Sequence, residues 1–227
     1  MQTQLWPGYI LHSRPLAEDK LILQLLLPQL GRLSAVVRKR QGKTRLALQP
    51  FQLLMLQLSG RSELKTVKSI DEAGPAPLFS GKVLYSGLYI NELVCRLWPD
   101  NLAAEQLFQL YQQCLTQLQA VQQGKAGLEP CLREFEFALL TELGQPIDWQ
   151  YDANGNGIVA ARQYQWQHEM GFVPVNRGIA GQLLLDIGQQ QWQHSATRQA
   201  AKQLSRQILA PLLGSKPLAS RALFSSS

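Results

Sequence analysis

The spacing of apolar residues changes once along this chain, at residues 71–81. Before this segment, short apolar runs follow a period of two and are separated by turn residues, as in strands. After it, leucines recur at three- and four-residue spacing, as on one face of a helix. The segment itself, DEAGPAPLFSG, has two prolines, two glycines and no period, which indicates a domain boundary. We therefore expect two domains, residues 1–75 and 76–227.

The first domain is predicted to be a small closed β-barrel. Its five short apolar segments are separated by turn residues at spacings of about 8–12 residues, as in small barrels. In the fourth segment Leu54, Leu56 and Leu58 share one face, and a turn follows at 59–61. Leucine is commoner here than β-branched residues, so the prediction depends on the period more than on strand propensity.

The second domain is predicted to be mainly helical. Pro99 and Gly144 follow two of its periodic segments, as helix-ending residues do. Two aromatic segments flank Asn-Gly-Asn-Gly at 154–157, which is typical of a hairpin turn. The expected fold is therefore α+β and multidomain, with a barrel, a mainly α-helical C-terminal domain and a β-hairpin inserted near 147–175. Helices are expected at about 84–98, 102–121, 129–143 and 195–213.

The net charge of +6 is concentrated in the first third of the chain. Residues 1–80 hold 11 Lys or Arg against 5 Asp or Glu, whereas the remainder holds 11 of each. The densest run, VVRKRQGKTR at 36–45, lies between the third and fourth expected strands. A charge run alone usually marks a solvated loop, but a basic barrel domain favours an anionic partner, most commonly nucleic acid. The candidate contacts here are Arg14, Arg32, Arg38, Lys39, Arg40, Lys43 and Arg45, with further cations at Lys20, Arg61, Lys65 and Lys68.

Two further features bear on nucleic-acid binding. The barrel domain has few aromatic residues, and two of them, Tyr9 and Phe51, could either stack bases or fill the core; the third is Trp6. On the last expected helix, three cations recur at every fourth residue and form one stripe. The stripe is either a plain solvated face or an extension of a path for phosphates. Its residues are Arg198, Lys202 and Arg206.

Motifs for catalysis and metal binding are absent from the sequence. There is no P-loop, GxGxxG or GxSxG, and the histidines lack metal-ligand neighbours, so we predict no enzyme activity, no cofactor and no metal. The segment 152–163 lacks the carboxylate that ends a calcium loop, and we interpret it as a turn. The odd number and wide spacing of Cys95, Cys114 and Cys131 predict free thiols. Without a membrane-spanning run or a leader-like start, we expect a cytoplasmic protein that contacts no membrane.

Four segments of the chain stand out: LQPF (48–51), GLYINEL (87–93), LREFEFALLTELG (132–144) and LLGSKPLASRALF (212–224). Together they resemble the bacterial RecO family of recombination mediators. Their order and spacing match along nearly the whole chain, and the second and fourth are the most specific. The resemblance implies an N-terminal OB-fold and a helical C-terminal domain. It implies no zinc here, because some members carry four cysteines where this chain has WQYDANGNG.

The resemblance also implies a function in DNA repair and recombination, on the nucleoid. Family members bind single- and double-stranded DNA, anneal complementary strands, and help RecR, in many bacteria with RecF, to load RecA onto DNA coated by single-stranded-DNA-binding protein. They also receive the acidic C-terminal tail of that protein on the helical domain. Arg133 matches the family arginine for this contact, and Leu132 and Phe135 are expected to line it. From the residues alone, an RNA-binding factor and a protein-interaction scaffold remain open.

Overall fold

The structure is a computed structural model that describes residues 4–38 and 48–224. Contacts divide the chain into two compact units. We call Met1–Ala126 with Leu218–Ser227 the barrel unit, and Gly127–Pro217 the inserted unit. The borders of these two units differ from those of the two domains expected from the sequence, 1–75 and 76–227. The division into those two domains stays a prediction.

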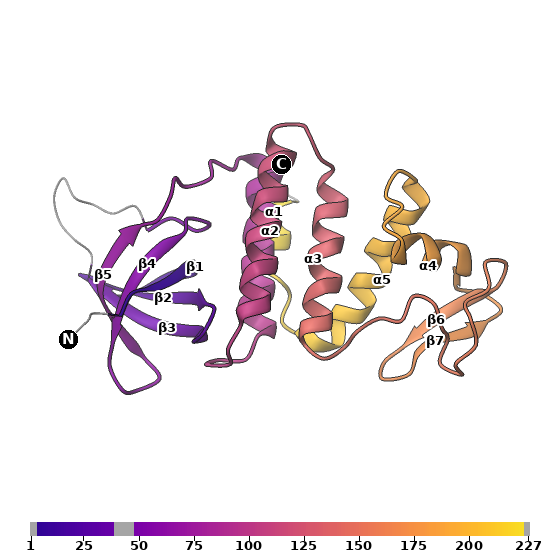
Figure 1. The fold of residues 1–227 in the computed structure, drawn as a ribbon, viewed down its shortest axis with the longest axis horizontal. Helices are drawn as coiled ribbons and strands as arrows, with labels where there is room; N and C mark the ends of the chain where they lie inside the picture. The colour runs from indigo at the N-terminus through magenta and orange to yellow at the C-terminus, as the bar shows by residue number, and fades with distance from the viewer. Residues whose placement is uncertain (1–3, 39–47, 225–227) are drawn as a thin grey trace. The chain divides into compact units, whose positions relative to one another are not determined.

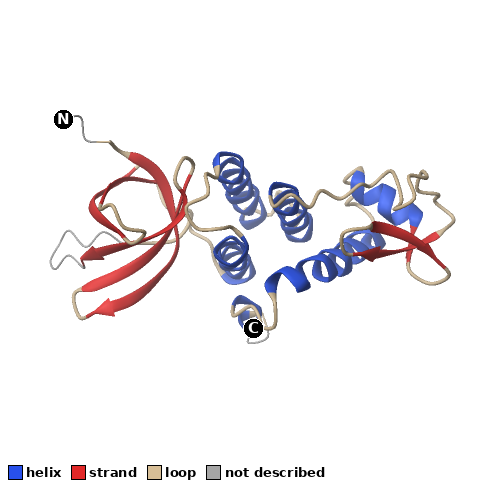
Figure 2. Ribbon diagram, turned by 90° about the horizontal axis from the view of Figure 1, so that it is seen from below, coloured by secondary structure: helices blue, strands red, loops and turns tan. Residues whose placement is uncertain are grey.

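The barrel unit begins with five strands that close into a barrel, drawn in indigo and purple in Figure 1 and in red in Figure 2. The strand order is β1-β2-β3-β5-β4, and only the β3–β5 pair is parallel. This arrangement confirms the predicted N-terminal barrel of the OB type. The strands are β1 (Trp6–Ala17), β2 (Lys20–Leu27), β3 (Gly31–Arg38), β4 (Leu54–Ser59) and β5 (Lys65–Glu72).

The barrel closes around one apolar face of each strand. Leu54 and Leu56 of β4 are buried, and Leu58 packs against the same core, as the period of two predicted. Each fully buried leucine stabilises the fold by roughly 2 kcal/mol relative to an exposed one. The core residues of β2 and β3 are Leu23, Leu25, Leu27, Leu33 and Ala35.

Helices α1, α2 and α6 complete the described part of the barrel unit. Helix α2 begins at Glu105, later than the predicted Leu102, because the preceding backbone bonds to the barrel instead. The N–H of Ala104 donates to the carbonyl of Pro28, in the turn between β2 and β3, at 2.7 Å. None of the described helices is long and apolar enough to cross a membrane. The bounds are α1 (Gly81–Leu97), α2 (Glu105–Gln122) and α6 (Ser220–Leu223).

Asn91 anchors α1 to both the barrel and α2. Its Nδ2 donates to the carbonyl of Leu11 on β1 at 2.9 Å, and its Oδ1 accepts from the hydroxyl of Tyr111 on α2 at 2.7 Å. Burial raises the pKa of Tyr111 well above its usual value, so the hydroxyl stays a donor. One turn earlier, Gly87 faces Phe51, and a Cβ there would lie 2.8 Å from the ring. The segment GLYINEL (87–93), which carries part of the family resemblance, therefore joins the barrel to α1 and α2.

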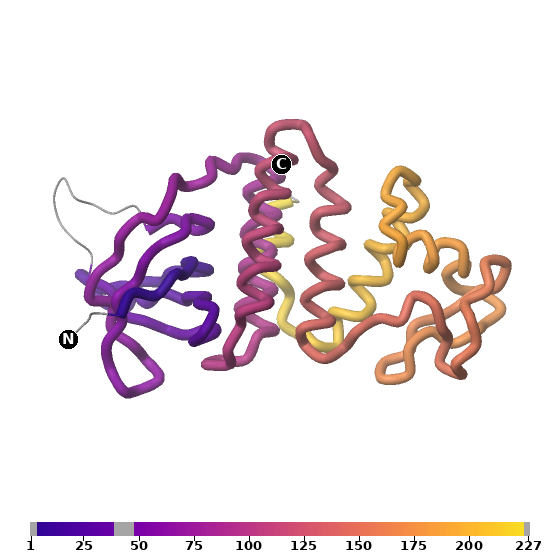
Figure 3. The backbone as a smooth tube through the Cα atoms, in the orientation of Figure 1, coloured from indigo at the N-terminus to yellow at the C-terminus, as the bar shows by residue number. Residues whose placement is uncertain are grey.

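Glu92, the next residue, holds the C-terminal segment against α1. Its carboxylate accepts hydrogen bonds from the N–H of Ala219 at 2.8 Å and of Ser220 at 2.9 Å. The Ser220 hydroxyl donates to it at 2.6 Å, and the ring of Phe224 packs edge-on against Tyr85. Figure 3 traces this return of the yellow end of the chain to α1. The two most specific family segments thus contact each other.

The inserted unit contains helices and a small sheet of order β7-β6-β8. Helix α5 spans the predicted range, and Gly144 follows the end of α3 with a φ of 77°, as predicted for a helix-ending glycine. Helix α4 was not predicted, because its 8 residues give too short a periodic segment. The elements are α3 (Leu128–Glu142), β6 (Gln163–Gln167), β7 (Gly171–Val175), β8 (Ile179–Ala180), α4 (Gly181–Gly188) and α5 (Ser195–Leu213).

The hairpin lies within the predicted region, 147–175, but its turn does not lie at the predicted residues. Strands β6 and β7 pair around a turn at 168–170, so that Tyr164, Trp166 and Phe172 are strand residues as expected. The prediction that the hairpin turns at 154–157 is therefore wrong.

The Asn-Gly-Asn-Gly segment forms a closed local loop instead of a hairpin turn. The Oδ1 atom of Asp152 accepts the N–H groups of Asn154 and Asn156, both at 2.9 Å. The two described segments that flank this loop pair through an isolated bridge between Tyr151 and Gly157, not through a ladder of strand hydrogen bonds. An aspartate that bonds its own following backbone favours such a loop over a ladder of strand hydrogen bonds.

Glu92→Gln is expected to destabilise the protein near neutral pH but not in acid. Burial alone would raise the pKa of Glu92, but hydrogen bonds from Ser220 and Ala219 and the charge of Arg96 outweigh it and lower the pKa. A lowered pKa means that the carboxylate stabilises the fold above its unfolded-state pKa, and that this contribution is lost as pH falls through the folded-state pKa.

The free energy of unfolding in urea should drop by about 1 kcal/mol at pH 7. The difference from wild type should hold down to the ordinary glutamate pKa of 4.5 and shrink below it, so that it is smaller at pH 3 than at pH 7. Glu63→Gln, at an exposed turn of the same unit, is the matched control and should change little at either pH. A loss in Glu92→Gln that is the same at both pH values would contradict the ionic role of Glu92.

Candidate nucleic-acid interface

Two of the cations predicted to contact DNA, and a third cation beside them, lie on the outer face of β1, β2 and β3, within the described residues. Because side chains alternate along a strand, the residues between the inward leucines of β2 face outward. Lys20, Ile22 and Gln24 lie on this side of β2, and of these Ile22 is covered by its neighbours, with 7% exposed. The register places Arg14 of β1 opposite Ile22, and Arg38 of β3 opposite Lys20. Arg14, Lys20 and Arg38 therefore lie in neighbouring cross-strand rows, and we call them the cationic face.

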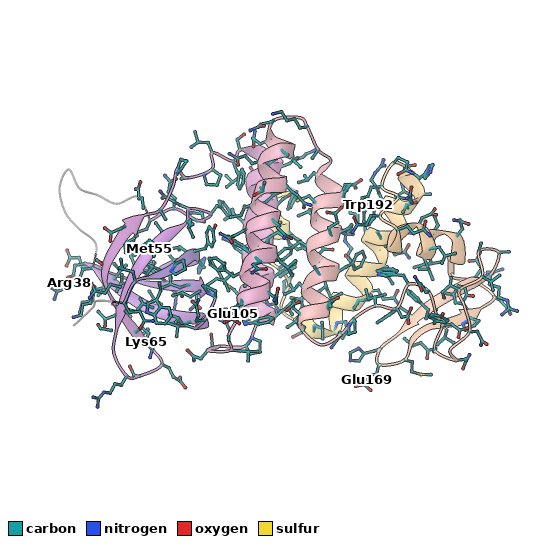
Figure 4. The ribbon with its side chains drawn as sticks, in the orientation of Figure 1. Arg38, Met55, Lys65, Glu105, Glu169 and Trp192 are labelled. Atoms are coloured by element: carbon teal, nitrogen blue, oxygen red, sulfur yellow. The ribbon has the colours of Figure 1, made fainter. Side chains whose placement is uncertain are left out.

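The cations of this face are accessible to a ligand. Arg14 and Arg38 are exposed, Lys20 is partly exposed, and Figure 4 shows Arg38 at the edge of the barrel. Arg38 lies 3.7 Å from Asp19, but the two side chains are 78% and 57% exposed. An exposed ion pair contributes only about 0–1 kcal/mol, so a phosphate can replace Asp19 at little cost.

The remaining predicted cations of the basic run lie outside the described residues. They follow Arg38 directly in the sequence, between β3 and β4. Their role in binding stays a prediction. They are Lys39, Arg40, Lys43 and Arg45.

Arg32, another predicted contact, is engaged within the protein. Its Nε donates to the carbonyl of Trp98 at 2.8 Å, and its Nη2 lies 3.0 Å from the carboxylate of Asp100. Its Nη1 donates to Gln24 at 3.4 Å, and only 15% of the side chain is exposed. The guanidinium joins β3 to the segment after α1, so we leave Arg32 out of the interface that we propose below.

The aromatic residues of the first 75 residues pack inside the barrel unit. Tyr9 is 5% exposed and packs against Phe108 and Tyr111, with ring centroids 5.3 and 5.0 Å apart. Phe51 is 4% exposed, and Trp6 packs against the barrel core. The alternative left open by the sequence is resolved for Tyr9 and Phe51, which are core residues.

The cationic stripe of α5 is partly neutralised within the inserted unit. Glu129 of α3 lies 3.3 Å from Arg198 and 3.9 Å from Lys202. Arg198 also donates to the carbonyl of Trp192 at 2.6 Å. Arg206, one turn further, is exposed. The stripe therefore has less net charge to offer a phosphate than the sequence suggests.

The residues predicted to receive an acidic peptide tail are mostly buried. Arg133 has 8% of its side chain exposed, and its guanidinium donates to Glu136 at 2.6 Å and to Ser205 at 3.2 Å. Phe135 is 3% exposed and Leu132 is half-buried. Contact between Arg133 and a peptide carboxylate would require its buried ion pair to open, which is costly.

The described residues contain no cluster of three or more His, Cys, Asp or Glu that could hold a metal ion. Cys114 and Cys131 are buried and form no disulfide, as predicted. Cys95 is half-buried, and burial raises its pKa to about 11, so it stays a protonated thiol at neutral pH.

A closed five-stranded barrel with this strand order defines a protein of the OB class, a fold that often carries nucleic-acid-binding sites. Two family models extend this description over most of the chain. "Recombination protein O N terminal" matches residues 1–75, and "Recombination protein O C terminal" matches residues 78–222. The chain belongs to the RecO family of DNA repair proteins.

Relatives named DNA repair protein RecO match over nearly their whole length. The protein of Stutzerimonas stutzeri is 42% identical over 222 residues, 96% of this chain and 92% of its own. That of Cellvibrio japonicus is 40% identical over 234 residues, 99% of this chain and 98% of its own. That of Pseudoalteromonas translucida is 36% identical over 233 residues, with both chains fully covered. The family resemblance inferred from the four segments is confirmed.

Arg32→Ala and Arg38→Ala are expected to differ in stability although both remove one cation of β3. Arg32→Ala should lower the free energy of unfolding by about 2–3 kcal/mol, because the carbonyl of Trp98 loses its donor and Asp100 its ion pair. Arg38→Ala should change it by less than about 0.5 kcal/mol. Urea unfolding measures both, and equal losses would contradict the structural role of Arg32.

Proposed function

We propose that this protein is a non-enzymatic mediator of DNA repair and homologous recombination. It binds single- and double-stranded DNA, anneals complementary strands, and helps RecR to load RecA onto DNA coated by single-stranded-DNA-binding protein. It acts in the cytoplasm, on the nucleoid. Membership of the RecO family along nearly the whole chain carries this proposal.

The barrel would hold DNA by its phosphates. Arg14, Lys20 and Arg38 present three cations on one outer face, and the other cations of the basic run follow Arg38 in the sequence. Binding would release counterions from the DNA, so affinity should fall steeply with salt. Arg206 on α5 is a further candidate for a phosphate contact, whereas Arg198 and Lys202 first have to separate from Glu129.

Annealing would follow from the same electrostatics. Two complementary strands repel each other through their phosphates, and the repulsion slows their encounter. A surface that neutralises phosphates on both strands raises their local concentration and lowers this repulsion. Such a mechanism needs no catalytic group.

The tail of single-stranded-DNA-binding protein would dock on the inserted unit near the start of α3. The accessible cations there are Arg198 and Lys202, which share Glu129, and Leu132 lies one turn along α3 from Glu129. The carboxylates of an acidic tail would compete with Glu129 for these cations. This proposal keeps the predicted location but moves the charge contact from Arg133 to neighbouring residues.

Replacing Arg14, Lys20 and Arg38 together by Ala should reduce the salt dependence of DNA binding. With roughly 0.7 counterions released per single-strand contact, the slope of log K against log salt should become less negative by about 2. The matched control, Lys125→Ala with Arg162→Ala and Arg177→Ala, removes the same charge from exposed positions elsewhere and should keep the slope. Fluorescence anisotropy at four salt concentrations measures it, and equal slopes for both triple variants would exclude the cationic face.

An annealing assay on the same variants tests the whole mechanism. The wild type should anneal complementary oligonucleotides, also when they are coated with single-stranded-DNA-binding protein, and the cationic-face variant should be slower. A protein-interaction scaffold would not anneal, and an RNA-binding factor would not overcome the coating protein.

Arg198→Ala with Lys202→Ala should weaken binding of a labelled tail peptide about tenfold, because two charge-assisted contacts are lost. Arg206→Ala, one turn further along α5, is the control and should bind the peptide normally. If a folded Arg133→Gln variant weakens binding while the double variant does not, the site lies at Arg133 with Leu132 and Phe135, as the sequence predicted.

A further inference from the structure

The barrel domain has few aromatic side chains with which to stack bases. Residues 1–75 contain Trp6, Tyr9 and Phe51 and no other Trp, Tyr or Phe, and this count from the sequence includes the residues that the structure does not describe. Tyr9 and Phe51 are buried, and Trp6 packs against the barrel core. Stacking of bases on exposed aromatic rings is the usual source of single-strand preference in OB domains.

The outer face itself is aliphatic and polar between its cations. The row from Arg14 continues through Ile22 to Val36, and the next row holds His12, Gln24 and Ser34. The side-chain amide of Gln24 donates to the hydroxyl of Ser34 at 2.8 Å, so these two polar groups bond each other. Within the described part of this face, His12 is the one side chain whose ring could stack a base, and it is exposed.

We infer that the barrel recognises the sugar-phosphate backbone alone and leaves the bases unstacked, an inference that rests on the proposed DNA binding. The ligand class is then any flexible polyanionic strand with nucleotide spacing, whatever its bases. A bound strand keeps its pairing edges free. A base stacked on a protein ring must leave that ring before it can stack on its neighbours in a duplex, whereas this barrel can hold a strand while its complement pairs with it.

The test compares two oligonucleotides of equal length, one of thymidine and one whose residues are all abasic tetrahydrofuran units. The full-length protein should bind both with affinities within about threefold. A single stacked base would favour the thymidine strand about fivefold to a hundredfold. Replacing Arg14, Lys20 and Arg38 by Ala should weaken binding of both strands by the same factor.

Two single variants locate any base preference that is observed. Tyr151, 52% exposed, is an aromatic side chain of the inserted unit, and a preference that Tyr151→Ala abolishes would lie outside the barrel and support the inference. A preference of more than threefold that survives Tyr151→Ala, or that His12→Ala abolishes, overturns it. Failure to bind even the thymidine strand would instead refute the proposed function, so the two failures are distinguishable.

Discussion

The barrel unit depends on one buried amide, that of Asn91. Asn91 lies on α1, donates a hydrogen bond to the carbonyl of Leu11 and accepts one from the hydroxyl of Tyr111. The two bonds join strand β1 to helix α2 through α1. Both partners are buried, so neither has water as an alternative, and an apolar residue at this position would leave two unpaired polar groups. The barrel and its helices therefore share this buried polar joint. Their other contacts include the hydrogen bonds of Ala104 to Pro28 and of Arg32 to Trp98, and the close approach of Gly87 to Phe51.

The cationic face follows from strand register. An inward leucine at every second residue of β2 leaves Lys20 on the opposite side, and pairing with β1 and β3 adds Arg14 and Arg38. The same packing removes the aromatic residues from that side, because Tyr9 and Phe51 lie beneath the helices and the partly buried Trp6 packs against the core. A surface that is cationic but poor in exposed aromatic rings is thus a consequence of how this small barrel is filled.

The sequence predicted the elements well where periodicity is long and local. The five strands and helix α5 are examples, whereas α4 is too short to stand out. The roles of individual arginines were harder to predict, because they depend on distant partners. Nothing near Arg32 in the sequence reveals Trp98 and Asp100, and the Arg133–Glu136 pair, although three residues apart, gives no sign from spacing that it is buried. The loop at 154–157 was missed for a different reason, since an Asp that bonds its own backbone competes with hairpin formation.

The bond between Glu92 and Ser220 has a consequence for the order in which the protein is made. Residues are synthesised from the N-terminus, and domains generally fold as they leave the ribosome. Most of the barrel unit is synthesised before Gly127–Pro217, yet its segment Leu218–Ser227 is synthesised only after it. Until then Glu92 has no partner from the C-terminal segment, and that surface of α1 is uncovered. A nascent chain that stalls before Leu218 therefore holds a barrel unit whose helix α1 still lacks its contacts with the segment that follows Pro217.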